Sequence, residues 1–252
     1  MSIETKVIGH VLWATIDREK SLGALDIPHL ESLVEMFRRA ANDDTLRTIV
    51  LTGKGRAFCV GADIKVMDAM TDMQFAQAAE LYQAMCREAR ALDKAVIAAV
   101  NGFALGGGLE VALMADIRVA ARSAKLGLPD AELGFSPTGG LTYLLNHIVG
   151  ASWALHLAMT AQILTAEESL RIGLVTEVVE DTDLEKFVLA LAQRLAAYPP
   201  TGMKNIKRSF NMALESSLSA ALTLEAEYDA ACYRSPETRQ ALRNFIEARK
   251  NR

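Results

Sequence analysis

Residues 101–112 read NGFALGGGLEVA and follow the short apolar run AVIAAV at residues 95–100. Glycine gives a core no side chain and costs about 0.5–1 kcal/mol relative to alanine inside a helix or strand. Three consecutive glycines before an apolar helix therefore need another explanation. They leave unhindered backbone N–H groups at a helix N-terminus, where the dipole is positive, and this favours an oxygen that develops negative charge.

Two nucleotide-binding loops share part of this pattern, and the spacing excludes both. A dinucleotide loop G-x-G-x-x-G that starts at Gly106 needs a sixth-position glycine, where this chain has Val111. A phosphate-binding loop needs G-K-S or G-K-T, but Leu109 follows the last glycine. The glycines therefore predict a site for a developing oxyanion.

The composition is that of an ordinary globular chain, since its 252 residues are 51% hydrophobic and 23% charged. A net charge of −4 gives no basic field for nucleic acid. Cys59, Cys86 and Cys232 are odd in number and form no C-x-x-C pair, which favours reduced thiols. Residues 1–10 lack the pattern of a secretory signal, so we expect a cytoplasmic protein.

One long segment, residues 133–166, contains no Asp, Glu, Lys or Arg. A membrane-spanning helix needs about 20 largely apolar residues. This segment is interrupted by Pro137, Gly139, Gly140 and Gly150, and also by several uncharged polar residues and histidines. We therefore predict helices buried in the core or in a subunit interface, and no membrane association.

Strand patterns alternate with helix patterns through most of the chain. Apolar strands are expected at residues 95–100, 116–121 and 173–179, with helical spacing between them. This alternation predicts an α/β domain with parallel strand pairing. The remainder is helical in pattern, with no repeat and no linker. We expect one domain, with a core at residues 1–195 and a helical region at residues 196–252.

A second loop, GRAFCVGADIK at residues 55–65, also follows a strand and brings glycine and small residues to a turn. Alone it reads as an ordinary surface connection between a strand and a helix. Together with the first loop it offers a second set of unhindered N–H groups. An oxyanion needs two donors about 3 Å away, and small residues let the backbone approach that closely.

These loops resemble those of the crotonase superfamily, the enoyl-CoA hydratases and isomerases. The likeness runs from IDREKSLGALD at residues 16–26, through KLGLPDAELGFSPTGG at residues 125–140, to the terminal FIEARK. It implies the ClpP/crotonase fold, a spiral of ββα units with a C-terminal helical region. It also implies a homotrimer, or a hexamer of two trimers, with residues 196–252 in trimerisation and over the bound CoA.

The resemblance implies specific roles in the two loops and the helix that follows. The backbone N–H groups of Ala62 and Gly107 would bind the thioester carbonyl oxygen. Glu110 would be the first catalytic acid, although a carboxylate there can also simply stabilise a helix N-terminus. The second acid falls 20 residues later, at Asp130.

Two positions depart from the family pattern, which usually has glutamate in place of Asp130 and glycine in place of Thr138. Aspartate is one methylene shorter, which withdraws its carboxylate by about 1.5 Å. Proton transfer needs a distance of about 2.6–3.2 Å or one bridging water. The details of the reaction therefore stay open. Glu132 is two positions out of register and is expected at the surface or in an interface.

Two carboxylates across one pocket suit the reversible addition of water to an α,β-unsaturated acyl-CoA thioester, with Glu110 as base for the water and Asp130 as the proton partner. We therefore expect an enoyl-CoA hydratase. One alternative is a Δ3,Δ2-enoyl-CoA isomerase, which manages with one acid, or another crotonase-type lyase. Another is a CoA-binding protein that has lost activity. No metal and no separate cofactor are expected, because CoA is part of the substrate.

The resemblance also implies where CoA lies, with adenine and pantetheine over the REKSLGA stretch. The residues expected to bind substrate and CoA are Lys20, Ser21, Leu22, Ala24, Ala62, Asp63, Ile64, Lys65, Gly107 and Thr138. Arg249 and Lys250 are further candidates for phosphate contacts, although charged residues on a terminal amphipathic helix are commonly just solvated.

Overall fold

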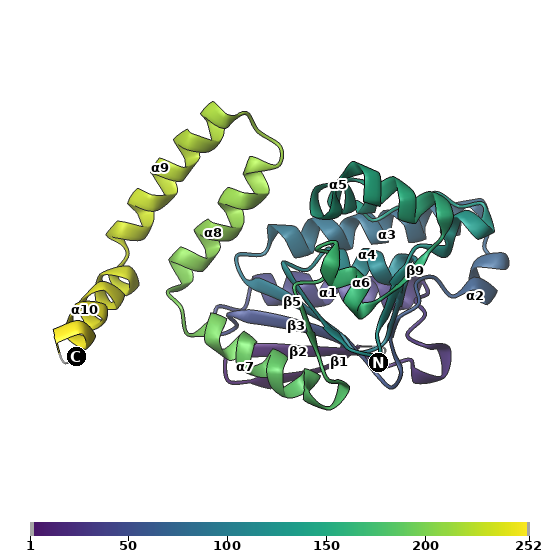
Figure 1. Ribbon diagram of the computed structural model, residues 1–252, viewed down its shortest axis with the longest axis horizontal. Coiled ribbons are helices and arrows are strands. Elements are labelled where there is room, and N and C mark those ends of the chain that lie inside the picture. The colour runs from purple at the N-terminus through teal and green to yellow at the C-terminus, as the bar shows by residue number, and fades with distance from the viewer. Residues whose placement is uncertain (1–2, 251–252) are drawn as a thin grey trace.

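The computed structural model describes residues 3–250, and of residue 250 the backbone only. Its larger sheet has the strand order β1-β2-β3-β5-β7-β10 (Figure 1). The bounds are β1 Ile3–Ile8, β2 Val11–Ile16, β3 Thr48–Gly53, β5 Ala95–Val100, β7 Ile117–Ala121 and β10 Glu177–Val179. β1 and β2 are antiparallel, and all other neighbours in this sheet are parallel.

A smaller sheet has the order β4-β6-β8-β9. Its strands are β4 Ala57–Cys59, β6 Phe103–Leu105, β8 Lys125–Gly127 and β9 Ile163–Thr165. Three successive units each place one strand in the larger sheet and the next in the smaller one, as β3-β4, β5-β6 and β7-β8. β4, β6 and β8 are parallel, so their carboxyl ends meet at one edge. The predicted α/β class with parallel pairing is confirmed.

The strand residues explain the arrangement of the larger sheet. Every residue of β5 is buried, as expected for a parallel strand that is covered on both faces. The expected strand at residues 173–179 is shorter in the structure, because Gly173 has a φ of 78° and turns the chain after α6 (Ala166–Arg171). Only Glu177–Val179 pairs with β7.

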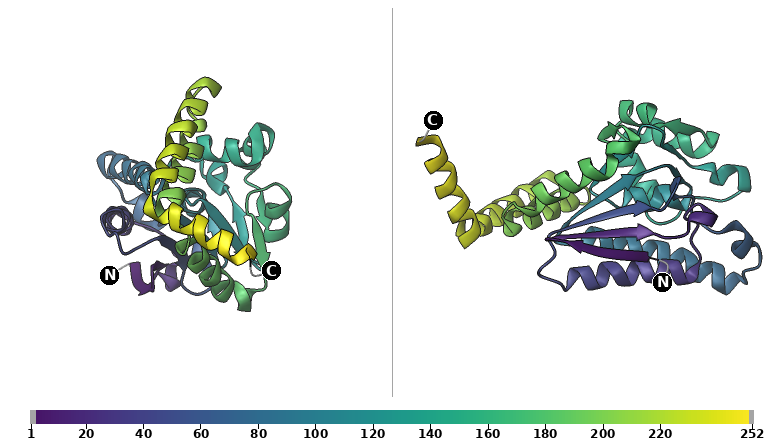
Figure 2. Two further views of the ribbon diagram at one scale, coloured as in Figure 1. Left: turned by 90° about the vertical axis from the view of Figure 1, so that its left-hand side faces the viewer. Right: turned by 90° about the horizontal axis from the view of Figure 1, so that it is seen from below.

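Helices cover both faces of the larger sheet (Figures 1 and 2). α1 packs along α3, and α7 packs on β2, β3, β5 and β7. The helices of the core are α1 Ile27–Ala41, α2 Ile64–Asp68, α3 Asp72–Ala91, α4 Gly107–Leu113, α5 Leu141–Thr160, α6 Ala166–Arg171 and α7 Leu184–Ala196. α3 begins at a capping box in which Thr71 and Gln74 exchange side-chain and backbone hydrogen bonds, which fixes its first turn.

The uncharged segment at residues 133–166 forms α5 and its flanks. α5 bends at Gly150, whose φ is 80° and ψ is 158°. Leu144 and Leu145 are buried, whereas Leu155 and Met159 are exposed, so only part of this apolar helix packs on the core. No helix within residues 3–250 is both long enough and apolar enough to span a bilayer.

Three helices, α8 Pro200–Ala213, α9 Leu218–Arg234 and α10 Pro236–Lys250, form an arm that extends from the core (Figures 1 and 2). Exposed apolar side chains line the arm, among them Ile206, Phe210, Leu218, Leu222, Phe245 and Ile246. A role of residues 196–252 in trimerisation or in covering CoA stays a prediction.

Lys207 fastens this arm to the core. Its side chain is 8% exposed, and its Nζ lies 2.9 Å from Asp116 Oδ2. The same Nζ donates hydrogen bonds to the carbonyl oxygens of Ala89 at 2.9 Å and Lys94 at 3.1 Å. One cation therefore joins α8 to the end of α3 and to the segments before β5 and β7.

Lys207→Met is expected to lower the free energy of unfolding by about 3 kcal/mol. This is the low end of the range for a broken buried ion pair, because Asp116 keeps 30% of its side chain exposed. Urea denaturation followed by circular dichroism measures the loss. Lys204→Met on the same helix is the control, since its pair with Asp93 at 3.0 Å is exposed and is worth at most about 1 kcal/mol. Equal losses in both variants would contradict the anchoring role.

Candidate active site

Three loops meet at the edge where β4, β6 and β8 end. The loop after β4 carries Ala62, the turn after β6 carries Gly107, and the turn after β8 carries Asp130. These residues lie far apart in the sequence and come together only because the three strands are neighbours in one parallel sheet. Ala62 is held in place by a bridge with Leu25, in which the Asp63 N–H donates to the Leu25 carbonyl at 2.9 Å.

The two glycine loops approach each other closely. A Cβ on Gly61 would lie 2.7 Å from the Gly107 nitrogen, so a larger residue has no room there. Gly106 has a φ of 52°, which ends β6 and starts α4 at Gly107. Within residues 3–250, neither the Ala62 N–H nor the Gly107 N–H donates a hydrogen bond. Two adjacent backbone donors are thus free to bind a ligand.

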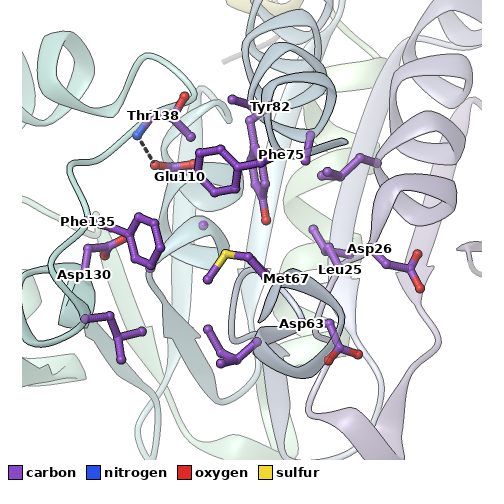
Figure 3. A pocket seen from close by; sticks show the side chains of 18 of the residues that line it. Leu25, Asp26, Asp63, Met67, Phe75, Tyr82, Glu110, Asp130, Phe135 and Thr138 are labelled. Carbon is purple, nitrogen blue, oxygen red and sulfur yellow. Dashed lines mark hydrogen bonds between the residues drawn. The ribbon is translucent and has the colours of Figure 1, made fainter. Parts of the chain in front are cut away.

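A cavity of about 130 Å³ lies in front of these loops (Figure 3). Ala62, Gly107, Glu110, Asp130 and Thr138 all line it, so the structure brings together the predicted donors and acids. The rest of the lining is largely apolar and includes Leu25, Leu30, Met67, Met70, Phe75, Leu133 and Phe135. The rings of Phe75 and Phe135 stack with centroids 5.8 Å apart.

Glu110 lies one turn into α4 and is 2% exposed. Its Oε1 accepts a hydrogen bond of 2.7 Å from the Thr138 N–H, while its Oε2 has no partner among residues 3–250. Burial raises the pKa of Glu110 to about 7; the Thr138 hydrogen bond opposes this rise and the negative charge of Asp130 adds to it. Such a carboxylate exchanges protons readily near neutral pH.

Asp130 lies in the 3-10 turn η2 (Pro129–Leu133). A Cβ on Gly106 would lie 3.5 Å from Asp130 Oδ2, so the carboxylate rests against the glycine loop. This Oδ2 is buried and has no hydrogen-bond partner in the described part of the chain. Burial raises the pKa of Asp130. The shorter acid therefore still enters the same cavity as Glu110.

The second departure from the family pattern, Thr138, contributes through its backbone. Its N–H is the donor to Glu110, and every residue except proline would supply this donor. The tight position is its neighbour Gly139, which has a φ of 58° and whose Cβ would lie 2.9 Å from Glu110 Oε2. Threonine at position 138 is thus compatible with the site.

The predicted CoA-binding residues divide into three groups: some line the cavity, some line a separate groove, and some line neither. Asp63 and Ile64 line the cavity, whereas Lys65 does not. Lys20 and Ser21 line a separate surface groove. Leu22 and Ala24 line neither space, but the Leu22 carbonyl accepts a hydrogen bond of 3.2 Å from Val60 N–H. A role for these residues in binding CoA stays a prediction.

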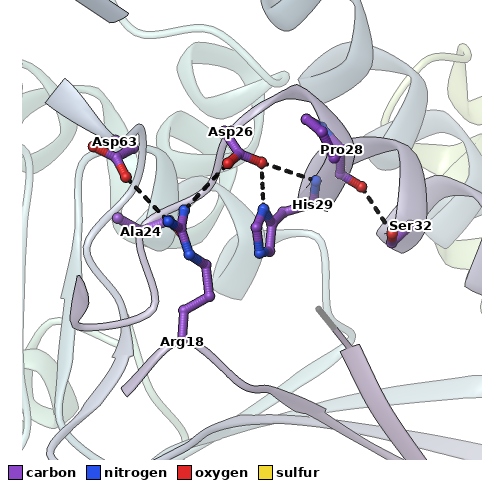
Figure 4. Close-up of polar contacts among 7 residues, drawn as sticks. All are labelled: Arg18, Ala24, Asp26, Pro28, His29, Ser32 and Asp63. Atoms are coloured by element: carbon purple, nitrogen blue, oxygen red, sulfur yellow. Dashed lines mark hydrogen bonds and ion pairs between the residues drawn. The ribbon is translucent and has the colours of Figure 1, made fainter. Parts of the chain in front are cut away.

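A polar network that the sequence did not reveal separates the groove from the cavity (Figure 4). Arg18 donates to the Ala24 carbonyl at 2.8 Å and lies 3.5 Å from Asp26 and 3.3 Å from Asp63. His29 Nδ1 contacts Asp26 as well. Arg18 therefore holds the start of α1 beside the Ala62 loop. The only sequence signal was Arg18 itself, within the IDREKSLGALD stretch.

Sequence reasoning also missed Tyr82, which lies on α3 and lines the cavity. The available signal was a single phenol on the buried side of an amphipathic helix, which is commonly a core residue.

Arg249 and Lys250, the candidates for phosphate contacts, belong to α10, and Arg249 does not line the cavity. The guanidinium of Arg249 stacks on Phe245 at 4.7 Å. Phe245 belongs to the same helix, which lies at the far end of the arm (Figure 1). The side chain of Lys250 lies outside the described residues.

Within residues 3–250, no group of three or more His, Cys, Asp or Glu side chains is arranged to hold a metal ion. The polar groups that line the cavity include backbone amides, the Glu110 and Asp130 carboxylates and the Tyr82 hydroxyl. Such a set can bind a carbonyl oxygen and move protons beside it.

Known proteins resemble this chain in sequence and in fold. The profile of the enoyl-CoA hydratase/isomerase family matches residues 8–252. The chain is 37% identical over 243 residues to a short-chain-enoyl-CoA hydratase of Clostridium acetobutylicum, covering 96% of this chain and 93% of that one. It is 34% identical to a 1,2-epoxyphenylacetyl-CoA isomerase of Escherichia coli, with 95% and 93% covered.

Among solved structures, an enoyl-CoA hydratase from Bacillus anthracis superposes with a TM-score of 0.96 at 30% identity, covering 98% of this chain and 97% of that one. The predicted crotonase-like architecture is therefore confirmed over nearly the whole chain. With both the sequence and the fold matched, this chain is a member of the enoyl-CoA hydratase/isomerase family.

Proposed function

We propose that this protein is an enoyl-CoA hydratase, which adds water reversibly to the double bond of an α,β-unsaturated acyl-CoA thioester. One observation carries the proposal: Glu110 and Asp130 each present a buried, unpartnered carboxylate oxygen to the cavity that Ala62 and Gly107 line with free N–H groups. The likeness to the hydratase of Clostridium acetobutylicum supports it.

In the proposed reaction, the thioester oxygen accepts hydrogen bonds from the Ala62 and Gly107 N–H groups. Ionised Glu110 takes a proton from water, whose oxygen bonds to Cβ, and the electron pair of the double bond moves onto the thioester. Asp130, whose raised pKa favours the protonated form, transfers its proton to Cα and completes the addition. Glu110 then releases its proton and Asp130 regains one through solvent. The two amides stabilise the enolate charge, and each donor is worth about 3 kcal/mol of barrier. CoA enters as part of the substrate, and we propose no other cofactor.

The direct test is the absorbance of the enoyl thioester band. Purified protein mixed with crotonyl-CoA is expected to remove this band as 3-hydroxybutyryl-CoA forms. Binding of crotonyl-CoA by calorimetry without any loss of the band would favour a CoA-binding protein without turnover. A panel of longer and aromatic enoyl-CoAs then defines the acyl preference.

An isomerase is the second candidate, favoured by aspartate at position 130 in place of the second glutamate. A Δ3,Δ2-enoyl-CoA isomerase would convert a 3-enoyl-CoA into a 2-enoyl-CoA, which makes the conjugated band appear. The hydratase proposal requires the band to decrease with a 2-enoyl-CoA. Each substrate alone therefore separates the two reactions.

The acidic limb of the pH profile is a further prediction. kcat/KM for crotonyl-CoA is expected to rise toward pH 7, because Glu110 accepts a proton only when ionised and burial raises its pKa to about 7. It should fall again once Asp130 loses the proton that it gives to Cα. At pH 6 the value should be about tenfold below the limit set by full ionisation of Glu110. Initial rates between pH 5 and 8 measure this, and a flat profile would contradict Glu110 as the base.

Assembly and location are part of the proposal. The exposed apolar side chains along α8, α9 and α10 support a homotrimer or a hexamer of two trimers. The three free cysteines support a reducing, cytoplasmic setting. Light scattering coupled to size exclusion tests the assembly, and a stable monomer would overturn it.

A further inference from the structure

Tyr82 is a buried polar residue of the cavity that the proposed reaction does not use. It is 4% exposed, and its hydroxyl has no hydrogen-bond partner among residues 3–250. A buried hydroxyl without a partner costs about 1–3 kcal/mol. Phenylalanine would fill the same volume without this cost. The hydroxyl therefore needs an explanation beyond packing.

The position of the hydroxyl indicates what it faces. A Cβ on Gly107 would lie 2.5 Å from the Tyr82 hydroxyl oxygen and 2.8 Å from the ring carbon that carries it. The hydroxyl is thus beside the residue whose N–H is a proposed donor to the thioester. Figure 3 shows the Tyr82 oxygen pointing toward the middle of the cavity that Glu110 and Asp130 also line.

The phenol is a donor under all ordinary conditions. Burial holds the pKa of Tyr82 well above its usual value, so the hydroxyl keeps its proton at neutral pH. The nearby unpartnered oxygens of Glu110 and Asp130 are acceptors, but neither bonds to Tyr82 in the structure. The acceptor for this donor is therefore a group that enters the cavity.

We propose that the Tyr82 hydroxyl donates a third hydrogen bond to the thioester oxygen, beside the N–H groups of Ala62 and Gly107. The inference rests on the proposed function, because it assumes an acyl-CoA thioester in this cavity. A third donor fixed before the reaction adds to the stabilisation of charge that develops on this oxygen. This hydrogen bond also gives a second reason why residue 107 is glycine, because any side chain there would displace the Tyr82 hydroxyl.

Butyryl-CoA labelled with ¹³C at the carbonyl tests this bond without turnover, because a saturated thioester cannot be hydrated. Infrared difference spectra give the carbonyl stretch of the bound ligand. Wild-type protein is expected to lower this stretch relative to water, and Tyr82→Phe is expected to lower it less. In parallel, kcat for crotonyl-CoA should fall about 10²-fold in Tyr82→Phe, with KM changed less than about threefold.

Tyr143→Phe is the matched control. The Tyr143 hydroxyl is also buried and has no partner in the described part of the chain. Tyr143 lies on α5, however, and lines a different pocket. Deleting it should leave both the carbonyl stretch and kcat unchanged. This control separates the loss of a buried hydroxyl in general from the loss of the hydroxyl beside Gly107.

An unchanged carbonyl stretch in Tyr82→Phe overturns the assignment, even if turnover falls, because the hydroxyl would then act on the water or on Glu110. If Tyr82→Phe does not fold, fluorotyrosine at position 82 replaces it: a more acidic phenol should lower the stretch further, and no change overturns the assignment. Wild-type protein that lowers the stretch of butyryl-CoA but does not hydrate crotonyl-CoA would refute the hydratase and leave the Tyr82 bond standing.

Discussion

Glu110→Gln is expected to reduce kcat for hydration of crotonyl-CoA by roughly 10²- to 10⁴-fold, the range for loss of a general base. The amide keeps the size and shape of the carboxylate, and its carbonyl oxygen can still accept the 2.7 Å hydrogen bond from Thr138. It cannot accept a proton from water. The acidic limb of the pH profile should disappear together with the activity.

Calorimetry with butyryl-CoA is the accompanying measurement, and its dissociation constant should stay within about twofold of wild type. Glu132→Gln is the control, because Glu132 lies in the same turn as Asp130 but is exposed and outside the cavity lining. Its turnover should be unchanged. Full activity in Glu110→Gln would remove Glu110 from the reaction and with it the two-carboxylate mechanism.

Gly108→Ala is expected to lower the free energy of unfolding by about 3 kcal/mol or more. A Cβ on Gly108 would lie 1.9 Å from the Cys59 carbonyl oxygen and 2.5 Å from its carbon. Both are backbone atoms at the end of β4, so no rotamer change relieves the overlap. The two loops that carry Ala62 and Gly107 must move apart, and activity should be lost with stability.

Gly202→Ala is the matched control, since Gly202 lies in α8 with open space around its Cβ position. The same substitution there should leave stability unchanged or raise it by up to about 1 kcal/mol. Thermal and urea denaturation of both variants measure the difference. A Gly108→Ala protein with wild-type stability and turnover would contradict the close packing of the two loops.

Much of the site could be predicted from the sequence because its backbone parts leave a strong signature. Glycine is costly in regular elements, so the glycines at residues 55–65 and 101–112 marked both loops. The likeness to a known family then indicated Glu110 and Asp130. The structure places both in one cavity with Ala62 and Gly107.

Other parts could not be predicted, because they depend on which elements become neighbours. Tyr82 has the helical spacing of a core residue, and only the packing of α3 against α4 brings its hydroxyl to Gly107. The bond from Thr138 to Glu110 uses a backbone N–H, which every residue except proline carries. Arg18 and Asp63 are 45 positions apart and meet across two loops.

The three glycines at residues 106–108 show which features follow from the sequence alone and which depend on tertiary structure. The amino-acid sequence by itself determined that this turn carries no side chains and starts a helix, since that is a local property of glycine and of the apolar residues after it. Tertiary structure decided why each glycine is needed: Gly106 for a φ of 52°, Gly107 for the Tyr82 hydroxyl, and Gly108 for the Cys59 carbonyl. Such contacts join segments that are distant along the chain, and only the pairing of β4, β6 and β8 in one parallel sheet sets their distances.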